Sequence, residues 1–160
     1  GFGLKKRTAE AVRRGIRASL TTAYLHCDEI DQLGLNIEAS SFVLTESYAH
    51  HLFVLDVVFT RYCQEKWATF AFFEESVLNG MIESEKVDER SDLLNLAPIL
   101  FNRLHAFKSM PAEDRTAYKH FIDSSELVKK QDKNTDQTTV VNMLAASTKK
   151  YERDLIPMFR

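Results

Sequence analysis

Apolar residues recur along most of this chain at the spacing of a helix, and they do not alternate with polar residues as a half-buried strand would require. In the first segment Val12, Ile16, Leu20, Ala23 and Cys27 follow one another at intervals of three or four residues. Glycine and proline, which interrupt regular structure, number five and three among 160 residues. The pattern therefore predicts an all-α protein, folded as a single helical bundle.

Six stretches carry this pattern, and caps or breakers separate them. We expect helices at residues 8–33, 41–62, 65–79, 92–108, 111–130 and 135–155. Gly34 and Gly80 are placed as C-terminal caps, and the last helix should stop before Pro157. A chain of this length is typical of one domain, so residues 1–160 should form a single all-helical domain.

The stretch from Ser41 to Gly80 is the most apolar part of the chain, and its apolar side chains lie on nearly the whole circumference of a helix. Such a helix is surrounded by other helices or lies in an oligomer interface. One unbroken helix here would be too long for a compact domain, so we expect a break between Tyr62 and Glu65. The sequence thus predicts a central pair of apolar helices, 41–62 and 65–79.

Polar groups standing among these apolar ones are the candidates for chemistry. His26, Glu46, His50 and Glu74 each project on a helix toward apolar neighbours. Helical bundles build metal sites from such side chains on facing helices, so a transition metal or small ligand held by these four residues is one hypothesis. The alternative is that Glu46 and His50 form an ordinary i,i+4 pair and that all four are simply hydrogen-bonded.

Common catalytic and cofactor signatures are absent from the sequence. There is no phosphate loop, no dinucleotide-binding glycine motif, no CxxC and no HExxH. His26 and Cys27 are adjacent, and on a helix their side chains diverge by about 100°, which argues against a catalytic dyad within the pair. These observations favour a non-enzymatic protein without a cofactor.

Charge is unevenly distributed, although the net charge is only −2. Residues 1–20 carry six basic and one acidic side chain, whereas residues 21–92 carry four basic and fourteen acidic ones. A basic first helix could contact nucleic acid or an anionic membrane surface, but aromatic residues are not interleaved with the basic ones, which makes nucleic acid an unlikely partner. The alternative is a solvated face that docks against acidic parts of its own or a sister chain.

Three further patterns bear on location and membrane association. No stretch of about 18 residues is uninterruptedly apolar, so no membrane span is expected, and the basic start is not followed by the apolar core of a signal peptide. Cys27 and Cys63 both lie on expected helices in a chain that needs no disulfide, which predicts a reduced, cytoplasmic protein.

Three functions remain open at this stage. The first is a non-enzymatic interaction or assembly protein, a homodimer or a partner for another protein, using spare apolar surface such as Phe72 together with the basic first helix. The second is a bundle holding a metal or small ligand through the four polar residues. The third is a nucleic-acid-linked regulator acting through the basic helix.

Overall fold

The computed structural model describes residues 2–32, 40–87, 93–110 and 137–160, and within these ranges all regular structure is helical, with no strand. Five helices are present there: α1 (Phe2–Gln32), α2 (Ser40–Tyr62), α3 (Phe70–Val87), α4 (Leu93–Lys108) and α8 (Gln137–Phe159). The all-α prediction is confirmed. The helix predicted at residues 111–130 and the cap predicted at Gly34 lie outside the described residues.

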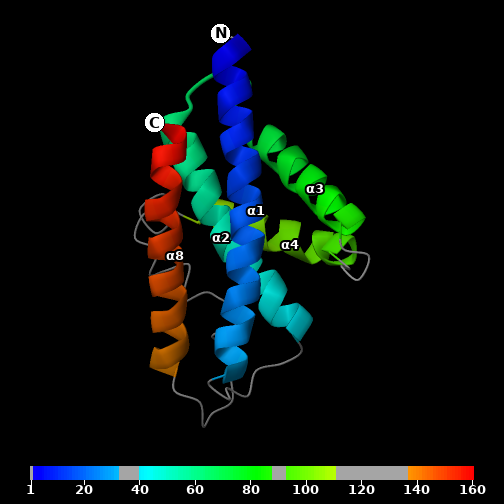
Figure 1. The fold of residues 1–160 in the computed structure, drawn as a ribbon, viewed down its shortest axis with the longest axis vertical. Coiled ribbons are helices and arrows are strands. Elements are labelled where there is room, and N and C mark those ends of the chain that lie inside the picture. Colours follow the sequence, from blue (N-terminus) through cyan, green and yellow to red (C-terminus); the bar gives the residue numbers. More distant parts are fainter. Residues whose placement is uncertain (1, 33–39, 88–92, 111–136) are drawn as a thin grey trace.

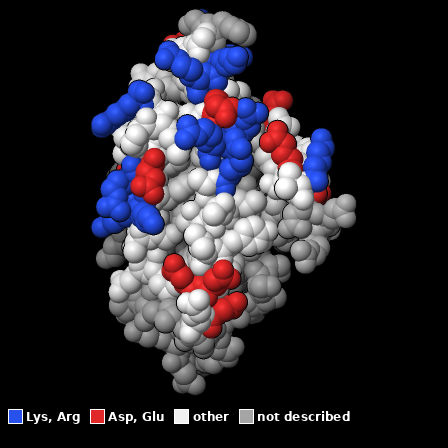
Figure 2. Space-filling view, viewed as in Figure 1, with Lys and Arg blue, Asp and Glu red and all other residues white. Residues whose placement is uncertain are grey.

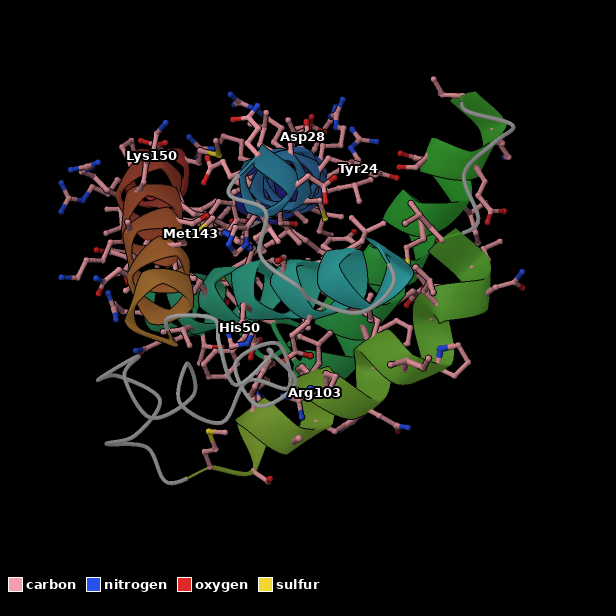
Figure 3. All side chains as sticks on the ribbon, turned by 90° about the horizontal axis from the view of Figure 1, so that it is seen from below. Tyr24, Asp28, His50, Arg103, Met143 and Lys150 are labelled. Atoms are coloured by element: carbon pink, nitrogen blue, oxygen red, sulfur yellow. The ribbon has the colours of Figure 1, made fainter. Side chains whose placement is uncertain are left out.

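Helix α2 forms the centre of the bundle. It runs antiparallel to α1 and parallel to α8, while α4 crosses behind it (Figure 1). Viewed along the bundle, α2 lies between α1 and α4 with α8 beside it (Figure 3). Because neighbours cover it on several sides, almost every side chain from Thr45 to Phe59 is buried. This is the arrangement expected of a helix that is apolar nearly all round.

The predicted break between the two apolar helices is confirmed, because α2 ends at Tyr62. The second helix, however, does not start at Glu65. It starts at Phe70, where the Thr69 hydroxyl accepts a hydrogen bond from the Phe72 amide at 3.1 Å and so caps the first turn. The sequence-based prediction overlooked this threonine cap and placed the helix start about five residues too early.

Gly80 is not a C-terminal cap, since α3 continues through it to Val87. A Cβ at Gly80 would lie 2.8 Å from a methyl carbon of Ile16, so the glycine allows α3 and α1 to pack closely. Gly15 plays the same part on α1, where a Cβ would lie 2.6 Å from Leu55 of α2 and 3.2 Å from Leu155 of α8. Both glycines therefore serve helix packing.

A central pair formed by α2 and α3 is not confirmed. Helix α3 packs mainly against α1 and α4, and only Phe73, Val77 and Met81 on it are buried. The ring of Phe72 does not point away from the monomer, because its centroid lies 5.2 Å from that of Trp67 and 5.9 Å from that of Phe59. The two rings lie side by side because Trp67 is not helical and folds back beside Phe72. A dimer that uses the apolar surface around Phe72 stays a prediction.

Two prolines lie inside helices. Pro98 lies within α4, as its apolar pattern suggested, and α8 continues through Pro157 to Phe159 instead of stopping before it. The prolyl ring removes one backbone hydrogen bond. In compensation, Ile156, Met158 and Phe159 pack against the core. Of the helices in the described part of the chain, none is long and apolar enough to cross a membrane.

Candidate functional site

Four polar residues on two successive turns in the middle of α2 are almost completely buried. Glu46 and His50 form one i,i+4 pair, and Ser47 and His51 form a second pair about 100° around the helix. Since α2 is enclosed by its neighbours, each pair must find partners on another helix or stay unsatisfied. The first pair faces α4, and the second faces α1 and α8.

Arg103 of α4 binds Glu46. Figure 3 shows Arg103 and His50 on the neighbouring helices α4 and α2. The guanidinium donates to both carboxylate oxygens of Glu46, at 3.0 and 2.9 Å, and His50 Nε2 donates to the same carboxylate at 3.3 Å. Burial alone raises the pKa of Glu46, but the hydrogen bonds from His50 and Arg103 outweigh it and lower the pKa to about 2. Burial also lowers the pKa of His50. At neutral pH the group is thus a carboxylate held by a neutral imidazole and a guanidinium.

His51 is fully buried and has partners for both ring nitrogens. Nδ1 lies 2.6 Å from the backbone oxygen of Ser47, which can only accept, so Nδ1 carries the proton. Nε2 therefore accepts from the hydroxyl of Ser147 on α8, at 2.7 Å. Burial lowers the pKa of His51 to about 3, which keeps the ring neutral. The Tyr151 ring packs edge-on to it, and the Tyr151 hydroxyl donates to the Gly15 oxygen at 2.7 Å.

His26 of α1 is only 1% exposed, and its Nδ1 lies 2.8 Å from the hydroxyl of Ser47. In the part of the chain that the structure describes, its Nε2 has no hydrogen-bond partner. Burial and, to a smaller extent, the nearby His50 lower the pKa of His26 to about 4, so the imidazole is neutral at pH 7. A neutral imidazole has one nitrogen that donates and one that accepts, so Nε2 is a buried polar atom without a partner among the described residues.

A groove of about 650 Å³ lies between α1 and α8, and His26 forms part of its wall. Ala18 and Leu25 on α1 and Met143, Leu155 and Met158 on α8 supply apolar walls. In the end-on view Met143 lies on the side of α8 that is turned toward α1 (Figure 3). Ser147 and Tyr151, the partners of His51, also line it, so the buried hydrogen-bond network reaches the groove wall.

The four predicted metal ligands do not form one cluster. Glu46 and His50 are together, whereas His26 bonds to Ser47 on another side of α2. Glu74 is partly exposed and pairs with the exposed His105, at 3.1 Å. Among the described residues, no group of three or more histidine, cysteine, aspartate or glutamate side chains is arranged to hold a metal ion.

Sequence reasoning missed the residues that surround these groups: Ser47, His51, Arg103, Ser147 and Tyr151. Only one signal in the sequence could have pointed to them: Ser47 and His51 repeat the i,i+4 spacing of Glu46 and His50 one residue later. A further tie between α2 and α4, the hydrogen bond from Lys108 to the buried Asp56 at 2.9 Å, was also missed.

The thiol of Cys27 has little reactivity in this structure. Cys27 and Cys63 are both free thiols. Burial, together with the nearby Asp31 and Asp28, raises the pKa of Cys27 to about 11. Because the thiolate is the reactive form, Cys27 is a poor nucleophile at neutral pH.

Comparisons with known protein-family models, curated proteins and solved structures found no match for this chain. The functional argument therefore rests on the geometry described above.

Proposed function

We propose that this protein binds a small, neutral, mainly apolar molecule in the groove between α1 and α8 and holds it through His26, without converting it chemically. The observation that carries this proposal is the buried Nε2 of His26, which has no hydrogen-bond partner among the described residues and belongs to a residue of the groove wall. A cytoplasmic setting is part of the proposal and is supported by the two free thiols.

The energetics favour a ligand at this position. A buried polar group without a partner costs about 1–3 kcal/mol. The neighbouring His51 avoids this cost, because each of its ring nitrogens has a partner. A ligand group that bonds to Nε2 of His26 would recover the cost on binding, and this would be additional to the burial of its apolar part.

The groove also restricts the ligand's chemistry. The charged residues along it are Glu29, Asp154 and Lys150, which together favour a neutral or cationic molecule over an anion. The Ser47 hydroxyl can donate to His26 Nδ1 or accept from it, so Nε2 presents either an N–H or a lone pair. A hydroxyl group on the ligand suits both cases, since it donates and accepts. An apolar alcohol or phenol is therefore the class that fits best.

Binding of 4-ethylphenol, compared with ethylbenzene, tests the proposal. We expect the phenol to bind in the millimolar range, as befits a ligand of this size, and to shift the His26 ring signals in nitrogen-detected NMR. In His26→Leu the groove stays apolar but loses the polar nitrogen, so the preference for phenol over ethylbenzene should fall by about tenfold. His105→Leu, an exposed histidine away from the groove, is the matched control.

Two results would contradict the proposal. One is that neither compound perturbs residues of the groove, and the other is that His26→Leu keeps the full preference for the phenol. Metal analysis of the purified protein separates this function from the alternative, a transition-metal protein using His26, Glu46, His50 and Glu74. A stoichiometric metal that is lost in His50→Ala would favour that alternative, because the imidazole nitrogen would be a ligand.

A further inference from the structure

The outer face of α1 carries opposite charges at its two ends. Five exposed cations lie on the first half of this face: Lys6, Arg7, Arg13, Arg14 and Arg17. Two exposed carboxylates, Asp28 and Asp31, lie near its C-terminal end. Figure 2 shows this separation on the front of the molecule, where the basic patch and the acidic patch are divided by uncharged surface. Only Glu10, paired with Arg13 and Arg17, interrupts the basic half.

We propose that two copies of this chain associate through this face, with their α1 helices antiparallel about a two-fold axis near Thr21. Arg14 and Asp28 lie on either side of Thr21 at the same distance, about two helical turns or roughly 10 Å. All three therefore share one face of the helix. A two-fold axis at Thr21 places each Arg14 opposite Asp28 of the partner subunit and makes the contact twice, as a self-complementary interface requires.

The uncharged middle of the face suits such a contact. Tyr24 and Leu25 are 43% and 58% exposed, and they provide apolar area next to the axis. Arg17 and Tyr24 are also spaced nearly symmetrically about Thr21, so the Arg17 guanidinium reaches the ring of Tyr24 of the partner subunit, a favourable cation–π arrangement. Thr21 itself is small enough to let the two helices approach closely.

Charge complementarity favours a second copy over a polyanion. A nucleic acid or an anionic membrane would be attracted by the basic half but repelled by Asp28 and Asp31 on the same face. A second, antiparallel copy places its acidic end against the basic end of the first copy, and its basic end against the acidic end. One helix pair buries an area at the low end of specific interfaces, so we expect a dimer of micromolar affinity that weakens as salt is added.

Sedimentation equilibrium of charge-reversed variants tests this interface. Arg14→Asp and Asp28→Arg each place like charges opposite one another, and each should weaken the dimer by about tenfold. An equimolar mixture of the two single variants should associate as tightly as the wild type, because every contact then joins opposite charges again. The double variant should also recover. Arg153→Asp, the same charge change at an exposed position on α8, should leave the affinity unchanged.

Thermal melting of each variant checks that the monomer still folds. The inference is overturned if the wild type stays monomeric at hundreds of micromolar, roughly the weak end of specific association. It is equally overturned if Arg14→Asp leaves the dimer intact, or if the two single variants fail to pair when mixed. A monomeric wild type that binds phosphatidylserine vesicles through Arg14 would assign the basic half to membranes instead.

Discussion

Acid should unfold this protein in the pH range where histidine titrates, well above the range of the carboxylates. His26 and His51 are buried, and their pKa values are lowered to about 4 and about 3. Burial also lowers the pKa of His50. In the unfolded chain all three should titrate near the ordinary value of about 6.5.

The sign follows from proton binding. Above pH 6.5 both states are neutral at these histidines, so folding carries no proton-linked penalty. As the pH falls below about 6.5 the unfolded chain binds protons that the folded protein cannot accept, and stability is lost until the pH reaches the folded pKa values. Glu46 acts in a lower window, because its pKa is lowered to about 2 and its contribution is lost only below the ordinary carboxylate value.

The magnitude can be worked out from these values. Between pH 7 and pH 5, His26 and His51 each remove about 2 kcal/mol, so together they remove about 4 kcal/mol, and His50 adds to this. A typical domain has about 5–15 kcal/mol of stability in total. Urea unfolding followed by far-ultraviolet circular dichroism at several pH values measures the loss directly.

A histidine variant separates this mechanism from general acid effects. At pH 5, unfolding of the wild type should take up at least about two protons from these side chains, and His51→Gln should reduce the uptake by about one. The reasoning is refuted if stability is the same at pH 5 and pH 7, or if His51→Gln leaves the pH slope as it was.

Three further variants test the packing. Arg103→Leu should cost about 3–5 kcal/mol in a denaturant titration, because it leaves the buried Glu46 carboxylate without its main partner, whereas a double variant that also replaces Glu46 by Leu should recover much of the loss. Gly15→Ala should destabilise the protein by about 1–3 kcal/mol, because the new Cβ would lie 2.6 Å from a methyl carbon of Leu55. This loss should outweigh the better helix propensity of alanine. An unchanged melting temperature would contradict the close approach of the helices. Phe53→Ala should cost about 3–5 kcal/mol in the same titration, because Phe53 is 1% exposed. Trp67→Ala should cost clearly less, because Trp67 is only partly buried. Equal losses would show that the two environments are alike.

Much of the fold was predictable from local pattern. The helical period, the all-round apolar character of α2 and its end at Tyr62 depend on residues close together in sequence, and the structure confirms them. The start of α3 was also local, since the capping hydroxyl of Thr69 is in the sequence, but the apolar pattern alone did not reveal it. The prediction that the last helix stops before Pro157 was wrong, because the core contacts of the neighbouring residues outweigh the loss of one helical hydrogen bond.

The candidate site was predictable only in part. The sequence singled out His26, Glu46 and His50 because polar groups stood among apolar ones, and all three are buried. It did not reveal that Glu74 would be partly exposed beside His105, because the rotation of α3 about its axis is set by its packing against α1 and α4. Amphipathic pattern fixes a buried face only approximately, and a side chain at its edge can turn either way.

The sequence by itself determined that this protein is helical, where its central helix begins and ends, and that His26, Glu46 and His50 would be buried. Only the tertiary structure decided their partners: Arg103 lies 57 residues from Glu46, and Ser147 lies 96 residues from His51. The same holds for the groove beside His26, which exists because α8 packs next to α1. The physical reason is that helix formation depends on neighbours three and four residues apart, whereas the pairing of buried polar groups depends on how whole helices are rotated and placed against one another.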